Sequence, residues 1–291
     1  MKRRFFKDRV DARRIDDITG MNQIMIDLKP KRSLGEVYIN KKMDVTNLMQ
    51  YIEEYKNKDN EQRLTLFHLF VTAIGKTIYN RSYLNRFIAN RHVYEHNEVI
   101  VSFIAKIEFN DESEEVMVLV PIEKDDTLIE VSKKINDKVN RIREKKSENK
   151  GANSAIIVLG KLPNIVRIPI VGILKFCDKI GLLPKSLMED NLYYSSMIVS
   201  NLGNLKCGGI YHNLTDFGTC SGLITIGEVK KEYVFNENGK KVEKYYCEFG
   251  VTMDERIADG YYMIKSIHLI EKLLNNPNLL EERADEKVKI D

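Results

Sequence analysis

The stretch Val251-Thr-Met-Asp-Glu-Arg-Ile-Ala-Asp-Gly-Tyr-Tyr, which ends at residue 262, decides the fold of this chain. Its first residues continue an alternating apolar pattern that begins at Tyr245, and such alternation is typical of a half-buried strand. After Asp259-Gly260, apolar residues recur at helical spacing from Met263 to Leu274. The stretch is therefore predicted to contain the end of a strand, a turn and the start of a helix.

A hairpin is predicted directly before this stretch. The segments Val229–Phe235 and Lys241–Met253 flank Asn238-Gly239, and both central residues of a type I′ turn need a positive φ, which Asn and Gly tolerate. Two further strands are predicted at Ser196–Asn201 and Gly222–Val229, which are rich in β-branched residues. The last hundred residues are thus expected to be strand-rich until the final helix.

Helices and strands are both predicted in the first half of the chain. The spacing of apolar residues predicts one helix over Asp44–Tyr55 and a second helix that starts near Thr65. Glu98–Ile107 and Glu115–Ile122 are β-branched and partly alternating, which predicts two strands. This mixture of elements indicates an α/β protein.

Two segments in the middle of the chain need separate interpretation. Thr127 and Glu130 form a capping box that opens a third helix, and this helix leads into the charged segment 143–151, which we expect to be a flexible loop. Residues 155–187 are apolar but interrupted by charges and prolines, whereas a transmembrane helix needs about 20 mostly apolar residues. We expect short helices there that cover the core or a subunit contact. A wall for an acyl chain or a membrane-docking surface is the alternative.

Length and composition limit the class of protein. With 291 residues, of which 43% are apolar and 31% charged, the chain suits a single domain over residues 1–291. The net charge of +3 is spread along the chain, so nothing indicates a nucleic-acid partner. Four widely separated cysteines predict reduced thiols rather than disulfides or a metal site. No apolar run follows the basic first residues, so we expect a cytoplasmic protein without a signal peptide.

Three motifs, in order along the chain, resemble a known family. Residues 254–260, Asp-Glu-Arg-Ile-Ala-Asp-Gly, are similar to the Asp-His-Arg-x-x-Asp-Gly signature of dihydrolipoyl acyltransferases of 2-oxoacid dehydrogenase complexes. Residues 198–204 resemble that family's Ile-Ser-Asn-Leu-Gly strand, and residues 65–107 resemble its long helix and following strand. The likeness runs from about residue 20 to 281, with residues 155–187 as an extra segment. It implies the chloramphenicol-acetyltransferase-like fold, an α/β fold with a mixed β-sheet flanked by helices.

The resemblance also implies an assembly and a chemistry. Members of this family form trimers with active sites between subunits, so a homotrimer is expected, with coenzyme A as a substrate and no metal. In the family the motif histidine accepts the proton of the reacting thiol. The motif aspartate corresponds to Asp259, which we expect to be structural, largely buried and paired with Arg13 or Arg14. Ser200 and Asn201 of the second motif are the candidate coenzyme A contacts.

This chain departs from the family at the catalytic position, because Glu255 stands where the family has histidine. A free glutamate has a pKa near 4.3 and an imidazole one near 6.5, so glutamate is the weaker base by about 3 kcal/mol. Where the family has its oxyanion-binding hydroxyl, the alignment places Tyr211 or His212, and a shifted alignment places Thr219-Cys-Ser-Gly there. His212 is a candidate replacement base that Glu255 would orient, as a carboxylate does in a catalytic triad. A loop histidine bonded to a backbone carbonyl is the alternative.

Two functional hypotheses follow. The chain is either a coenzyme A-dependent acyltransferase that uses His212, Glu255 and Tyr211, or a non-catalytic trimeric scaffold or acyl- or lipid-binding subunit. The missing histidine favours weak or absent activity in the usual reaction, because a positioned general base contributes roughly 10²–10⁴-fold in rate. We expect no lipoyl domain in this sequence, so a lipoyl group or acyl carrier would belong to a partner chain.

Overall fold

The main β-sheet has six strands and carries the core of the molecule. A computed structural model describes residues 4, 7–58, 62–106, 115–145 and 158–290. In the described part the strands are β2 (Glu36–Asp44), β5 (Val99–Lys106), β6 (Glu115–Ile122), β7 (Met197–Asn201), β8 (Gly222–Phe235) and β9 (Lys241–Asp254). Their order in the sheet is β2-β9-β8-β7-β5-β6. Strand β7 is parallel to both β5 and β8 and the other pairs are antiparallel, so the predicted mixed sheet is confirmed.

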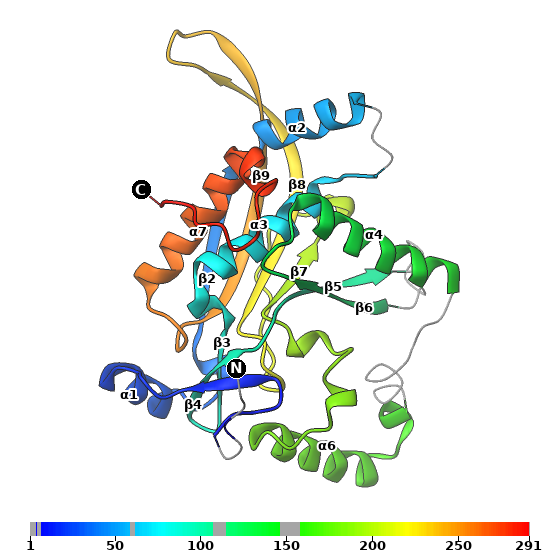
Figure 1. The fold of residues 1–291 in the computed structure, drawn as a ribbon, viewed down its shortest axis with the longest axis vertical. Helices are drawn as coiled ribbons and strands as arrows, with labels where there is room; N and C mark the ends of the chain where they lie inside the picture. Colours follow the sequence, from blue (N-terminus) through cyan, green and yellow to red (C-terminus); the bar gives the residue numbers. More distant parts are fainter. Residues whose placement is uncertain (1–3, 5–6, 59–61, 107–114, 146–157, 291) are drawn as a thin grey trace.

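A second, smaller sheet lies at one end of the main sheet (Figure 1). It pairs β1 (Ala12–Ile15), β4 (His92–His96) and β3 (Arg86–Ala89) in the order β1-β4-β3, all antiparallel. A short helix, α1 (Gly20–Leu28), follows β1 and brings the chain to the start of β2. The N-terminal segment is thereby placed next to the end of β9, where the turn of residues 254–259 begins.

Helices cover one face of the main sheet. They are α2 (Thr46–Asn57), α3 (Leu66–Asn80), α4 (Leu128–Lys145) and α7 (Gly260–Asn275), as Figure 1 shows. The predicted alternation in β9 explains the arrangement, because Cys247, Phe249, Val251 and Met253 belong to the core beneath these helices. The residues between them, such as Gly250 and Thr252, lie on the opposite face, where a loop crosses the sheet. Helix α3 is the central helix, and its residues 68–78 are all buried.

The predicted hairpin is present, but its turn differs from the prediction. Strands β8 and β9 extend beyond the sheet as a long two-stranded arm (Figure 1). A positive φ occurs at Gly239 and not at Asn238, and the Gly239 amide donates to the carbonyl of Asn236 at 2.9 Å. This is a type I turn followed by a left-handed glycine, not a type I′ turn. The Asn236 side chain stabilises it by accepting hydrogen bonds from the amides of Asn238 and Lys240.

Two predictions for the middle of the chain need correction. Helix α4 continues to Lys145, so residues 143–145 of the expected loop are helical, while 146–151 lie outside the described residues. In the apolar segment, of which 155–157 are likewise outside, short helical stretches occur at 158–161 and at Lys185–Leu187, but between them lies one longer helix of 16 residues, α6 (Asn164–Lys179). Pro169 does not break it, because the bond that Pro169 cannot donate would reach Ile165, and both residues are exposed to solvent. None of the described helices combines the length and hydrophobicity that a bilayer crossing requires.

Candidate functional site

Glycines allow a loop to cross the open face of the main sheet. Residues 207–213 run over β8 and β9, where a Cβ atom on Gly250 would overlap the carbonyl of Ile210. A Cβ on Gly227 would lie 2.6 Å from the Gly209 amide nitrogen. Thr225 donates a hydrogen bond to the Ile210 carbonyl. The small residues on both sides therefore set the height of the loop above the sheet and place the side chains that follow it.

Tyr211 and His212 stand at the end of this crossing, and both side chains are exposed. The His212 amide donates to Thr252 Oγ1 at 3.4 Å, and its Nδ1 lies 3.2 Å from the Asn213 carbonyl oxygen. The ring of Tyr211 is 5.4 Å from that of Tyr38 on β2. His212 thus has the backbone carbonyl contact of the simpler alternative, while its Nε2 makes no hydrogen bond within the described chain.

Glu36 fixes the next part of the loop to β2. Its carboxylate accepts hydrogen bonds from the Leu214 amide at 2.7 Å and from the Asn213 side-chain amide at 2.9 Å. The hydroxyl of Tyr38 also donates to Glu36, at 2.6 Å, and this bond raises the pKa of Tyr38. A carboxylate at the first residue of an edge strand therefore orients the loop that carries His212. Sequence reasoning missed Glu36 because nothing in its local pattern distinguishes it.

A buried ion pair builds the turn after β9. Asp254 is fully buried, and both of its oxygens accept bonds from Arg256, with Nε at 2.8 Å and Nη2 at 2.6 Å. The third nitrogen of Arg256, Nη1, donates to the Lys29 carbonyl at 2.8 Å. Planar two-point pairing of this kind is the strongest arrangement for a carboxylate and an arginine. It gives the turn a fixed shape that does not depend on Glu255 or Asp259.

Arg32 joins this turn to the loop of His212. Its Nη2 donates to the Gly218 carbonyl at 2.9 Å and its Nη1 to the Thr215 carbonyl at 2.5 Å. Its Nε lies 4.0 Å from Asp254 Oδ2. Burial lowers the pKa of the Arg32 guanidinium, and the charge of Asp254 opposes this shift. One buried cation thus links the two segments that carry the predicted site residues.

Glu255 occupies the motif position and has a cationic partner. Its amide donates to the Gly35 carbonyl at 2.8 Å, and its carboxylate forms an ion pair with Lys29 at the end of α1. Both side chains are about one-third exposed, with 28% for Glu255 and 34% for Lys29. Within the described chain Glu255 and His212 are not bonded to each other, since each has a different partner. Lys29 was not predicted as a site residue.

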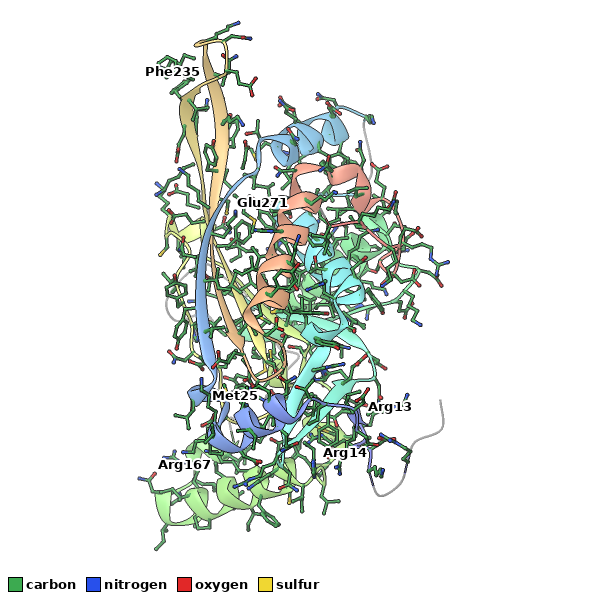
Figure 2. The ribbon with its side chains drawn as sticks, turned by 90° about the vertical axis from the view of Figure 1, so that its left-hand side faces the viewer. Arg13, Arg14, Met25, Arg167, Phe235 and Glu271 are labelled. Atoms are coloured by element: carbon green, nitrogen blue, oxygen red, sulfur yellow. The ribbon has the colours of Figure 1, made fainter. Side chains whose placement is uncertain are left out.

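The prediction for Asp259 was wrong in two respects. Asp259 is exposed, and its Oδ1 accepts a hydrogen bond from the Tyr262 amide at 2.7 Å, so it caps α7. The expected arginine partners lie elsewhere on β1 (Figure 2), where Arg13 is opposite Glu95 and Arg14 Nε is 3.3 Å from Asp16. The physical reason is that Asp254 and Arg256 already form the buried pair of the turn, which leaves Asp259 free to act as the helix cap.

A large cleft is lined both by residues of α3 and α4 and by residues of the loop. Its volume is about 1560 Å³, and Ser200, Asn201 and His212 all belong to its lining. Asn201 Oδ1 accepts a hydrogen bond from the Gly203 amide at 3.0 Å, which orients the side chain. Tyr211 and Glu255 are not part of the lining that the described residues form. The structure therefore brings three of the predicted site residues to one cleft.

The hydroxyl groups of the shifted alignment point into the protein. Thr219 and Ser221 are buried, and Thr219 Oγ1 lies 2.9 Å from His96 Nε2. Burial lowers the pKa of His96 to about 4, so its ring is neutral at physiological pH. Neither Thr219 nor Ser221 belongs to the lining of the cleft. Among the described residues, no group of histidine, cysteine and carboxylate side chains is arranged to hold a metal ion.

Comparisons with known proteins identify the family of the chain. The family model for 2-oxoacid dehydrogenases acyltransferase (catalytic domain) matches residues 14–171 and 184–281. The unmatched residues 172–183 overlap the second half of α6, which is part of the segment that was predicted to be extra. No curated protein sequence matches the chain significantly.

Solved structures share the fold at low sequence identity. A probable dihydrolipoamide acetyltransferase from Listeria monocytogenes is 13% identical, covers 95% of this chain and 98% of its own, and has a TM-score of 0.57. The dihydrolipoamide acetyltransferase of Azotobacter vinelandii is 12% identical, with 92% and 94% covered and a TM-score of 0.59. A chloramphenicol acetyltransferase is 10% identical, with 92% and 99% covered and a TM-score of 0.51. The chain has the chloramphenicol-acetyltransferase-like fold and belongs to the family of 2-oxoacid dehydrogenase acyltransferase catalytic domains.

Proposed function

We propose that this protein keeps the fold and cleft of a coenzyme A-dependent acyltransferase and binds a ligand in the cleft, but catalyses the usual acyl transfer weakly or not at all. One observation carries the proposal: at the position of the family's catalytic histidine, the side chain is a carboxylate ion-paired with Lys29. The usual reaction needs a group that takes the proton of a thiol. An ion-paired carboxylate is poorly suited to that task, because a free thiol has a pKa of about 8.5 and a free glutamate one of about 4.3.

Charge repulsion works in the same direction. A thiolate that formed beside Glu255 would face a second negative charge, and Lys29 is already engaged with that carboxylate. The opposite wall of the family's active site supports the same conclusion, because the alignment of the motifs puts Tyr211 or His212, both exposed here, where the family has a small hydroxyl. Both changes reduce stabilisation of the reacting atoms and leave the cleft available for binding.

The proposed ligand of the cleft is the acyl thioester of coenzyme A, or an acyl group on a lipoyl-bearing or acyl-carrier partner chain. Ser200 and Asn201 would contact it from the end of β7. Arg63, Lys133 and Arg143 belong to the lining and supply positive charge toward phosphate groups. We also propose a homotrimer, as in the family, and a monomeric mass by light scattering would contradict this part.

The test restores the family's residue. Acetyl transfer from acetyl-coenzyme A to dihydrolipoamide is measured for the natural protein, for Glu255→His and for Glu228→His, a matched variant that puts an imidazole in the cleft lining but not at the motif position. The natural protein should be close to the uncatalysed rate, and Glu255→His should gain roughly 10²–10⁴-fold, the usual contribution of a positioned base. Lys29→Met added to Glu255→His removes the neighbouring cation and should increase the gain.

The outcomes separate the alternatives. Substantial transfer by the natural protein would overturn the proposal. If Glu255→His gains nothing while calorimetry still detects coenzyme A binding, the protein is a binding subunit whose opposite wall is also unsuited to the reaction. If coenzyme A does not bind at all, the cleft serves another ligand and the proposal fails.

A second candidate function is supported by the free Nε2 of His212, which lies in the cleft lining. In this alternative His212 is the base. Since His212 and Glu255 are not bonded to each other within one chain, the Glu255 that orients His212 would belong to a neighbouring subunit. His212→Ala would then abolish any transfer found with some acyl donor, while Glu255→Gln would slow it less. Full activity in both variants would exclude both residues from the reaction.

A further inference from the structure

Helix α6 is attached to the rest of the chain along one narrow side. Asp178 is the one buried residue of the helix, and its carboxylate accepts bonds from the Tyr194 hydroxyl at 2.7 Å and the Gly218 amide at 3.0 Å. Arg9 pairs with the same carboxylate at 3.3 Å. This anchor fixes the orientation of the helix, so the side chains on its other side are held in a defined direction.

The outer side of α6 is an apolar stripe. Ile165 is 84% exposed, Ile173 and Phe176 are each 62% exposed, and Ile180, just after the helix, is 41% exposed. Together with Pro169 these residues recur at steps of four, four, three and four, which keeps them on one face of a helix. Contiguous exposed apolar surface of this kind marks an interaction site in a folded protein.

Positive charges accompany the stripe. Lys161, Arg167, Lys175 and Lys179 lie in or beside the helix, and none of the four pairs with a carboxylate in the described part of the chain. The one acidic residue between positions 158 and 188 is Asp178, which is buried and neutralised by Arg9. The segment is therefore cationic on its accessible surface, although the whole chain carries a net charge of only +3.

These charges determine which partner fits. In a symmetric contact with a second copy of this chain, the lysines of the two helices would approach each other and repel. An anionic bilayer complements both features, because apolar side chains enter the headgroup region while lysine and arginine meet the negative surface. Helix α1, at the same end of the molecule in Figure 2, also exposes Met21, Ile24 and Leu28 but carries Asp27 and no lysine or arginine.

We propose that α6 is a membrane-docking helix: its stripe of Ile165, Ile173, Phe176 and Ile180 and its flanking cations bind the surface of an anionic lipid bilayer. The helix lies along the bilayer and does not cross it, since it has only 16 residues and contains Pro169. This activity is separate from any acyl chemistry, because neither the stripe nor the four cations belong to the lining of the cleft.

The experiment measures sedimentation of the full chain with vesicles of phosphatidylcholine, with or without phosphatidylserine. Binding should require phosphatidylserine and weaken as salt is raised. Lys175→Gln with Lys179→Gln should lower the partition coefficient about 25-fold, since each cation near an anionic surface contributes about fivefold. The matched control is Lys240→Gln with Lys241→Gln at the tip of the β8–β9 arm, which should bind like the natural protein.

The apolar stripe is tested in the same way. Ile173→Ser with Phe176→Ser should reduce binding at least about tenfold, whereas Tyr233→Ser with Phe235→Ser on the arm should not. Because all four side chains are at the surface, circular dichroism should show an unchanged fold. Equal sedimentation of the natural protein with both kinds of vesicle, or α6 variants that bind normally, would overturn the proposal. The proposal would also be overturned if the natural protein did not bind vesicles but formed an oligomer that dissociates in the α6 variants. The stripe would then contact a second copy of the chain.

Discussion

Arg256 holds both carboxylate oxygens of Asp254, a residue only two positions before it in the same turn, at 2.8 and 2.6 Å. Both side chains are almost completely removed from solvent. The pair is local in sequence, and Arg256 Nη1 also donates to the Lys29 carbonyl, so the turn between β9 and α7 is fixed both by its own residues and by the N-terminal segment. The family signature contains both residues, but the resemblance drew attention to Asp259 instead.

Removing one partner of this pair should strongly destabilise the protein. Asp254→Asn keeps the shape of the side chain but leaves the buried Arg256 cation uncompensated, which costs on the order of 3–5 kcal/mol. Urea unfolding measures the change in free energy of unfolding. The matched control is Glu189→Gln, which breaks the exposed pair with Lys185 and should cost less than about 1 kcal/mol. Equal losses in the two variants would mean that burial does not determine the strength of the Asp254 pair.

Asp259 should behave as a helix cap and not as a buried ion. Asp259→Ala removes the acceptor of the Tyr262 amide and should lower the free energy of unfolding by about 1 kcal/mol. Asp259→Asn should have little effect, because asparagine caps helices about as well as aspartate. Thermal unfolding of the two variants distinguishes these cases. A large loss in Asp259→Asn would instead require a charged partner that the single chain does not provide.

Alanine should have opposite effects on stability at two glycine positions, one beneath the loop that crosses the sheet and one in the exposed helix α6. Gly250→Ala forces a methyl group into the Ile210 carbonyl, and overpacking of this kind typically costs about 1–3 kcal/mol. Gly172→Ala in α6 meets no atom within 4 Å, so it should stabilise the protein by roughly 0.5–1 kcal/mol through helix propensity. Chemical denaturation compares the pair. The loop position is wrongly assigned if Gly250→Ala is tolerated as well as Gly172→Ala.

His96 should make stability depend on pH below neutrality. Its pKa is about 4 in the folded protein, whereas an unfolded histidine has a pKa of about 6.5. Between these values the unfolded chain binds a proton that the folded chain does not, so the free energy of unfolding rises with pH. The contribution is complete above about pH 6.5 and is lost as the pH falls toward 4, by about 1.4 kcal/mol per unit.

His96→Gln removes the contribution of His96 to this dependence while keeping a polar group near Thr219. The slope of unfolding free energy against pH should therefore be smaller in the variant between about pH 4.5 and 6, and equal to that of the natural protein above pH 8. Urea titrations at a series of pH values provide the comparison. Parallel slopes throughout would show that His96 is protonated in the folded state.

Much of the fold could be predicted from local patterns. The strand–turn–helix around Asp259-Gly260, the bond from the Thr127 amide to the Glu130 carboxylate at the start of α4, and the strands β5 to β9 all depend on residues close together in the sequence. The hairpin turn failed because Asn238-Gly239 fits two turn types, and the side chain of Asn236 stabilises the second one. The length of α6 was not predicted from the sequence: Pro169 lies inside the helix, where the carbonyl that loses its hydrogen bond is on the exposed side and can bond to water.

The site was harder to predict, because its important contacts are long-range. Lys29, Arg32 and Glu36 follow the N-terminal helix, and each meets a segment about 180 or more positions away. No local pattern indicates such contacts, so the sequence identified Glu255 and His212 without their partners. The family signature located the turn correctly, but it could not show which of its two aspartates is buried.

Arg32 also has a consequence for the dynamics of the protein. Its guanidinium binds carbonyls of the loop at residues 215 and 218 and lies beside Asp254 in the turn, so neither segment can open without exposing the same buried cation. Amide hydrogen exchange should then report these two stretches as one cooperative unit with a common opening free energy. A ligand that immobilises His212 would also slow amide exchange at residues 254–257. Exchange at this turn, which does not line the cleft, would therefore report binding in the cleft.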